Sequence, residues 1–310
     1  MATKKTTSGF QELKSIVRNK KVMVSILTTL SLLILFRIGS VIPMPFASMN
    51  ADALSQSSFL QMMNMLGGGG LRRISIFAIG ISPYITAQII IQLLSSDLIP
   101  PLSRLSKSGE RGRKKIEIIT RIFTLPFAVI QAYAIISLAS TNTDVITFDL
   151  PNGDSLSPFY YFFYILLMTT GTYVAIFLGD VITKKGVGNG ITLIILAGIV
   201  ASLFSSFETV FGTLTSGAGQ SKALTSVINF VVYLLFYVIL LVAVVFINGS
   251  VRKIPIQQTG QGLTSNRDEL PYLPLKINAA GVIPVIFASS VMTIPSTIAQ
   301  FLPADGNGPK

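Results

Sequence analysis

Seven apolar stretches, each about 20 residues long, set the main constraint on how this chain can fold. A helix of that length crosses the roughly 30 Å hydrocarbon core of a bilayer. The stretches lie at residues 22–42, 74–94, 118–138, 159–178, 191–211, 227–247 and 277–298. Half of all residues are hydrophobic and only 12% are charged. The sequence therefore predicts an all-α, polytopic membrane helix bundle, since helices satisfy their own backbone hydrogen bonds where water is absent.

The run from residue 59 to residue 95 departs from this simple pattern. It begins with an apolar segment, 59–66, that is too short to cross a bilayer. Four glycines follow at 67–70, then the pair Arg72 and Arg73, and only then a stretch long enough to span. Irregular backbone persists at membrane depth only inside protein or beside a water-filled cavity. We therefore expect an internal cavity with a small mobile element next to it.

The composition excludes several kinds of chemistry. The chain has no cysteine and no histidine, which rules out disulfides, thiolate nucleophiles, imidazole catalysis and soft-metal sites. The glycine-rich stretch 186–190 follows no strand, and glycines 67–70 lack the Lys and Ser/Thr of a phosphate-binding loop. We expect no catalytic site, no metal and no cofactor.

The distribution of Lys and Arg predicts the orientation in the membrane. The N-terminal segment carries six, the connection at 96–121 seven, the fourth-to-fifth connection two and the sixth-to-seventh connection four, which makes 19 of the 24 in the chain. All of these lie on one side if the seven stretches span in turn. Because cytoplasmic loops are enriched in Lys and Arg, the N-terminus is expected in the cytoplasm and residue 310 on the outer side. The net charge of +11 is thus mainly a signal of topology.

A short pattern recurs in two predicted spans that run in opposite directions. Residues 80–85 and 281–286 both read Gly-x-x-Pro-x-Ile near the start of a span. Corresponding interrupted segments in inverted halves point to the functional site of a transport fold. The alternative is coincidence, because Gly and Pro are common in membrane helices.

Isoleucines and polar residues mark possible inner faces of two spans. Ile81 and Ile85 are four residues apart, as are Ile191 and Ile195, so each pair shares one helix face. Either pair could equally face lipid. Polar side chains in the second and fifth spans favour a wet or protein-facing surface, with helix packing as the alternative: Ser82, Thr86, Gln88, Gln92 and Asn189.

Several of these stretches together resemble the SecY family, the central subunit of the bacterial protein-conducting channel. The resemblance is carried by residues 36–45, 59–94, 110–121, 179–202 and 272–292. It implies an inverted-repeat fold of ten spans, of which this sequence holds about seven and stops after the seventh. On this basis we divide the chain into a cytoplasmic segment at 1–21, a first half at 22–211 and the start of a second half at 212–310, with a cytoplasmic loop at 249–276.

The same resemblance implies roles for particular residues. The pore ring would comprise Ile81, Ile85, Ile191, Ile195 and Ile286. The plug, at about 55–71, would include Phe59, Met62, Met63, Met65, Leu66, Gly67, Gly68, Gly69 and Gly70. A lateral gate between the second and seventh spans would involve Pro83, Thr86, Gln92, Asn189, Pro284, Ser289 and Ser290. Docking of a ribosome or motor would use Arg111, Arg113, Lys114, Lys115, Arg252, Lys253 and Arg267.

Partners and location follow from the resemblance as well. It implies SecE-like and SecG-like small membrane subunits, the SecA motor ATPase, the ribosome, signal peptides, nascent chains and phospholipids, in a bacterial plasma membrane. One feature departs from the family pattern, because Arg267 at the tip of the 249–276 loop is followed by Asp268 and Glu269. These acids partly cancel the positive charge that the family usually places there.

Two other functions remain compatible with the residues alone. A secondary transporter would also show inverted repeats and broken spans, but it would carry ionisable residues within the spans for ion coupling. The spans here contain almost none beyond Arg37. A non-conducting assembly scaffold is the second alternative. An intramembrane enzyme would need a catalytic pair such as Ser-His or Asp-Asp within the bilayer, and the spans have none.

The orientation can be tested by cysteine labelling, which the absence of native cysteines makes simple. Single cysteines at Ser106 and Ser265 should react with an impermeant thiol reagent only after the membrane is opened, because both loops are expected in the cytoplasm. Labelling of either position from outside intact cells would overturn the assignment.

Overall fold

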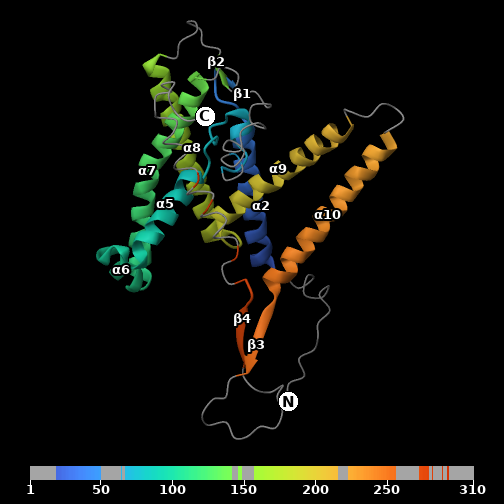
Figure 1. The fold of residues 1–310 in the computed structure, drawn as a ribbon. Helices are drawn as coiled ribbons and strands as arrows, with labels where there is room; N and C mark the ends of the chain where they lie inside the picture. Colours follow the sequence, from blue (N-terminus) through green and yellow to red (C-terminus); the bar gives the residue numbers. More distant parts are fainter. Residues whose placement is uncertain are drawn as a thin grey trace, which may run out of the picture. The chain divides into compact units, whose positions relative to one another are not determined.

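The computed structural model describes residues 19–49, 64, 67–141, 146–148, 157–215, 223–255, 272–278, 281, 288 and 292 (Figure 1). Its longer helices are α2 (Lys20–Val41), α5 (Ser82–Leu93), α7 (Glu110–Thr141), α8 (Pro158–Lys185), α9 (Gly190–Thr215) and α10 (Ala223–Gly249). The shorter elements are the 3₁₀ turn η1 (Leu71–Arg73), the π-helical turn η2 (Leu94–Leu98) and helix α6 (Pro100–Lys107). Two compact units divide within α9, between Leu203 and Phe204.

Five helices match expected spans. In the part of the chain that the structure describes, α2, α7, α8, α9 and α10 are long and apolar enough to cross a membrane. Helix α7 begins eight residues before the predicted span at 118–138, because its basic first turns continue the same helix. The seventh predicted span, 277–298, lies almost entirely outside the described residues.

The second predicted span is only partly helical, which corrects the expectation of a continuous apolar helix at 74–94. Helix α5 begins at Ser82, and the preceding residues form turns in the interior of the first unit. Pro83 lies in the first turn of α5, where its missing N–H costs no hydrogen bond. Gly80, at φ +55°, adopts a backbone conformation that continues no helix. Including α6, which bends away from α5 by 95°, the described chain offers up to six spans.

The irregular segment before α5 is fixed by the chain that follows α2. The Met44 N–H donates to the Ile74 carbonyl oxygen at 2.8 Å, and the Tyr164 hydroxyl of α8 donates to the Pro45 oxygen at 2.9 Å. Around these contacts lies a buried apolar cluster drawn from the chain after α2, the irregular segment, α7 and α8: Met44, Ala47, Leu71, Ile74, Ala78, Ile79, Ala132, Ile135, Ile136, Tyr164 and Met168. The irregular backbone is therefore enclosed by protein, as its position in an apolar stretch requires.

Two small antiparallel sheets accompany the helices, although the sequence indicated no strands. Strand β1 (Ala47–Met49) pairs with β2 (Ile146–Phe148), which brings the chain after α2 beside the chain after α7. In the second unit, β3 (Val251–Pro255) pairs with β4 (Tyr272–Lys276). The first pairing places the ends of two expected spans on the same side, as their alternating order demands.

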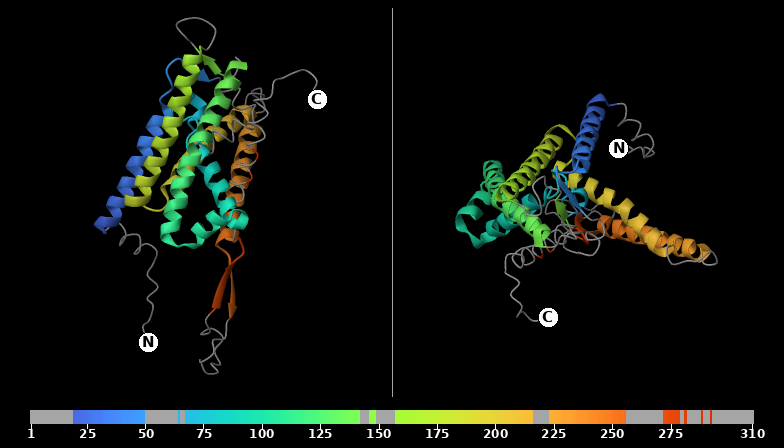
Figure 2. Two further views of the ribbon diagram at one scale, coloured as in Figure 1. Left: turned by 90° about the vertical axis from the view of Figure 1, so that its left-hand side faces the viewer. Right: turned by 90° about the horizontal axis from the view of Figure 1, so that it is seen from above.

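Helix α8 is central to the first unit. It packs against both α2 and α7, and α5 packs against α7 (Figure 2). A side chain at Gly171 of α8 would overlap the Ile76 carbonyl oxygen, so α8 passes directly over the irregular segment. In the second unit, Phe207 on α9 contacts the rings of Tyr233 and Tyr237 on α10.

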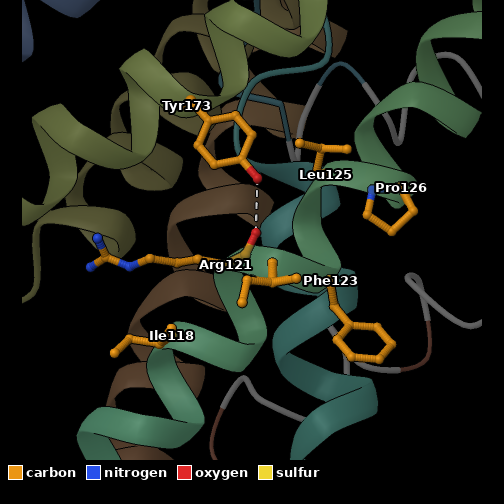
Figure 3. A pocket seen from close by; sticks show the side chains of 7 residues that line it. Ile118, Arg121, Phe123, Leu125, Pro126 and Tyr173 are labelled. Carbon is orange, nitrogen blue, oxygen red and sulfur yellow. Dashed lines mark hydrogen bonds between the residues drawn. The ribbon is translucent and has the colours of Figure 1, made fainter.

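An ion-pair network joins α7 to α8. The Arg121 guanidinium pairs with Glu117 on its own helix and with Asp180 of α8, at 2.7 Å from the Asp180 oxygen. The Tyr173 hydroxyl of α8 donates to the Arg121 carbonyl oxygen at 2.8 Å (Figure 3). Arg121 and Tyr173 border an open groove of about 490 Å³, whose other lining residues are Ile118, Ile122, Phe123, Leu125 and Pro126. These contacts fix the position of α7 along α8, although α7 contains a proline, Pro126.

Removing the interhelical carboxylate should weaken this unit. We expect Asp180→Asn to lower the free energy of unfolding by about 1–2 kcal/mol, because a charge-assisted bond to a partly shielded cation is lost. Glu110→Gln serves as the control. Its partner Lys114 lies 3.0 Å away, but both side chains are largely exposed, and such pairs contribute little. Thermal unfolding in detergent should therefore separate the two variants, and equal melting temperatures would contradict the structural role of Asp180.

Candidate functional site

The glycine run at 67–70 lies where helices of the first unit meet. A Cβ added at Gly80, just before α5, would overlap the Gly67 carbonyl oxygen. One added at Gly198 of α9 would overlap the Cα of Gly68. A Cβ at Gly68 would itself lie 2.9 Å from the Phe36 ring of α2. The run is thus held by backbone-to-backbone contacts on two sides and by an aromatic ring on a third.

Hydrogen bonds close the run into a compact loop. The backbone oxygen of Asn64 accepts from the Gly69 N–H at 2.7 Å, and its side-chain oxygen accepts from the Leu71 N–H at 3.1 Å. The Ser75 N–H and hydroxyl both donate to the Gly70 carbonyl oxygen at 3.1 Å. Asn64 and Leu71 are buried, so these bonds replace water that cannot reach the backbone.

This geometry gives the glycines a more specific role than flexibility. Gly68 and Gly69 have φ values of +87° and +84°, which other residues rarely adopt. This conformation favours glycine at both positions, and at Gly68 the Phe36 ring of α2 also leaves little room for a Cβ. The remaining residues predicted for the plug lie outside the described part of the chain: Phe59, Met62, Met63, Met65 and Leu66.

The isoleucines predicted to line a pore are mostly turned inward. Ile81, Ile85 and Ile195 are 0%, 7% and 9% exposed, so these three do not face lipid. Ile191 is half-buried, and Ile286 lies outside the described residues. Although Ile81 precedes the first residue of α5, its carbonyl oxygen accepts from the Ile85 N–H at 3.1 Å, so the two keep helical spacing.

Helix α9 presents an inner face that the sequence reading captured only in part. The buried positions are Gly190, Ile194, Ile195 and Gly198, which recur at the spacing of one helix face. Ile194 is completely buried, and its Cγ2 would lie 3.9 Å from a Cβ at Gly68. The spacing of Ile191, Ile194, Ile195 and Gly198 in the sequence was the available signal for this face.

The residues predicted for a lateral gate are divided between different environments. Pro83 and Thr86 are buried at the start of α5, where the Thr86 hydroxyl donates to the Ser82 carbonyl oxygen. Gln92 is exposed. The side-chain oxygen of Asn189 accepts from the Ile191 N–H at 3.1 Å and so caps the first turn of α9, a use that the sequence reading missed. Pro284, Ser289 and Ser290 lie outside the described residues.

The glycine-rich turn between α8 and α9 is fixed by two threonines. The Thr29 oxygen of α2 accepts from the Val187 N–H at 3.0 Å, and the Thr183 oxygen accepts from the Gly190 N–H at 2.8 Å. A Cβ at Gly190 would overlap the Gly179 carbonyl oxygen. The glycine here serves close packing between two helices.

The basic residues proposed for docking lie at two exposed places. Arg111, Arg113, Lys114 and Lys115 are exposed in the first turns of α7. Arg252 and Lys253 are exposed on β3, and the Lys253 ammonium lies 4.8 Å above the centre of the Tyr272 ring on β4. Arg267 falls outside the described residues.

The sequence of this chain is similar to those of a known protein family. The SecY family profile matches residues 75–308. The protein translocase subunit SecY of Mycoplasmoides gallisepticum is 54% identical over 299 residues, and that of Mycoplasma pneumoniae is 51% identical over 308 residues. These alignments cover 94% and 97% of this chain but only 59% and 64% of the relatives. The chain thus spans about three fifths of the length of these relatives.

Solved structures show the same fold at lower sequence identity. The solved structure of a protein-conducting channel matches this fold with a TM-score of 0.61 and 19% sequence identity. The match covers 95% of this chain and 63% of the channel chain. Sec61 from a canine ribosome–channel complex of the endoplasmic reticulum matches with a TM-score of 0.60 and 19% identity, over 95% of this chain and 64% of its own. Together, the family profile and relatives with about half of their aligned residues identical show that this chain belongs to the SecY family.

Proposed function

We propose that this chain forms the greater part of a channel that passes unfolded polypeptides across a bacterial plasma membrane and releases apolar segments sideways into the lipid. The observation that carries the proposal is the enclosed irregular segment at 67–81, with its glycine run packed between α2, the start of α5 and α9. Non-helical backbone is tolerated within the membrane only inside protein or beside a water-filled cavity. A segment that covers a pore and can be displaced from it accounts for such backbone here.

The proposed constriction is a short apolar ring. Ile81, Ile85, Ile191, Ile195 and Ile286 would form it, and inward burial of three of them supports this role. An apolar constriction opposes the passage of water and ions when empty. The isoleucine side chains can move apart around a translocating chain, so the same ring would seal around cargo. The plug at about 55–71 would provide a second closure.

Sideways release would occur between the second and seventh spans. The broken start of α5 supports this role, because Gly80 and Pro83 separate an irregular segment from a regular helix at one point. The matching Gly-x-x-Pro-x-Ile pattern at 281–286 would supply the opposite edge of the gate. A signal peptide, which is itself an apolar helix, could then occupy the opening.

Partners would supply the energy for translocation. SecE-like and SecG-like subunits would stabilise the assembly, and SecA or a ribosome would dock on the cytoplasmic basic residues. The protein named Sec61 among the structural relatives was solved in a ribosome–channel complex. Cytoplasmic placement of the N-terminus is supported by the distribution of positive charges. A secondary transporter is disfavoured by membership in the SecY family.

The pore ring can be tested by conductance across planar bilayers, using the full-length channel with its small subunits. Ile85→Asn and Ile191→Asn should each raise the resting ion leak several-fold, because a polar amide wets an apolar constriction. Ile90→Asn is the matched control, since Ile90 is half-buried on another face of α5. If neither ring variant leaks above the wild type, or if Ile90→Asn leaks equally, the ring is wrongly assigned.

Docking can be tested by charge reversal. Arg252→Glu with Lys253→Glu should weaken binding of SecA or ribosomes by about tenfold or more. Arg267→Glu should have a smaller effect, because Asp268 and Glu269 already offset its charge. Binding would be measured by co-sedimentation at low and high salt, and the loss should be larger at low salt. Equal losses from both changes would mean that the loop tip still makes the main contact.

A further inference from the structure

We infer that Gly198 of α9 forms a notch that sets the closed position of the glycine run at 67–70, which we call the plug tether. Asn64, through hydrogen bonds within this loop, latches the tether in the shape that fits the notch. This inference rests on the proposed channel function and assigns the control of closure to two positioning residues. Its basis is a set of contacts around the glycine run that flexibility alone does not require.

The notch is built from one missing side chain. Gly198 is buried within α9, and a Cβ there would overlap the Cα of Gly68 and lie 2.7 Å from its carbonyl carbon. Those atoms are backbone, so they cannot move aside as the end of a flexible side chain could. The Phe36 ring of α2 lies 2.9 Å from the Cβ position at Gly68, so α2 borders the tether as well. The tether is therefore held between α2 and α9.

The latch is the buried Asn64. Its backbone oxygen accepts from the Gly69 N–H and its side-chain oxygen accepts from the Leu71 N–H, which fixes the loop around the two glycines with positive φ. Leu71 is completely buried, and Ser75 holds the Gly70 oxygen from the other side. Movement of the tether must then separate Gly68 from Gly198, and loss of the Asn64 bonds would loosen the loop that fits the notch.

Gly198 is not required by its backbone conformation, which is the common reason for a glycine. It lies inside a regular helix with no left-handed backbone conformation, where alanine is the better helix former. A Gly198→Ala exchange should thus favour α9 itself and disfavour only the closed contact. Gly212 of the same helix has open space at its Cβ position, which makes Gly212→Ala a matched control.

The experiment uses the full-length channel with its SecE-like and SecG-like subunits in planar bilayers. Gly198→Ala should raise the resting ion conductance about tenfold, the scale on which overpacking shifts a closed population. Gly212→Ala should leave it unchanged. Asn64→Ala should raise it as well, and the double variant should leak less than the product of the two single effects, because both residues act on one tether.

Two readouts separate this inference from others. SecA-driven translocation of a preprotein by the wild type tests the channel function itself, and its absence would overturn that function.

If the wild type translocates but Gly198→Ala and Gly212→Ala leak no more than the wild type, the notch does not set closure. A lower unfolding temperature for Gly198→Ala with no change in leak would assign Gly198 to helix packing alone. If Gly198→Ala fails to assemble, the leak of Asn64→Ala decides the question, and an unchanged leak there overturns the latch.

Discussion

Backbone groups that water cannot reach must find partners, and the first unit is arranged around one segment that meets this demand without being a helix. From Gly67 to Ile81 the chain turns repeatedly in the protein interior. Its N–H and C=O groups are met by Asn64, Ser75 and the Met44 backbone. The surrounding helices follow from this need, because α2, α7 and α8 contribute the apolar cover and α9 contributes the glycine that lets it approach. A side chain at Gly171 of α8 or Gly198 of α9 would push these helices away from the irregular segment.

The long helices could be predicted from the sequence because hydrophobic length is a strong signal in a membrane protein. The predicted spans at 191–211 and 227–247 differ from α9 and α10 by only a few residues at each end. The same measure failed at 74–94, where an apolar stretch of the right length is only half helical. Hydropathy records that a segment is buried but not whether protein or lipid covers it, because residues buried in protein have much the same composition as those buried in lipid. Gly80 and Pro83 marked the break, but their spacing alone does not say where the helix starts.

The candidate site was predictable where a role depends on residue type and was missed where it depends on geometry. Buried isoleucines at helical spacing were found, and Asn189 was noticed as a polar residue at the start of a span. Its use as the cap of α9 depends on the backbone direction at that point, which the sequence leaves open. Likewise, Asn64 in an apolar run gives no sign that its oxygens reach Gly69 and Leu71. The short sheets were missed because three to five residues carry too little periodicity to indicate a strand.

If the proposed channel is closed by packing contacts at the tether, the strength of those contacts decides how easily it opens. The described contacts at the tether are hydrogen bonds from Asn64 and Ser75, together with close approach of the glycines. Each neutral hydrogen bond contributes a net of about 1 kcal/mol, so the tether can be released for a few kcal/mol. A partner shifts such an equilibrium only by the difference in its affinity for the two states, and a few kcal/mol lies within the range of one docking event. The ion pairs Arg121–Asp180 and Arg121–Glu117 lie instead between or within helices of the frame, where a fixed register is needed. The stronger interactions hold the scaffold together, and the weaker ones hold the segment that we propose to move.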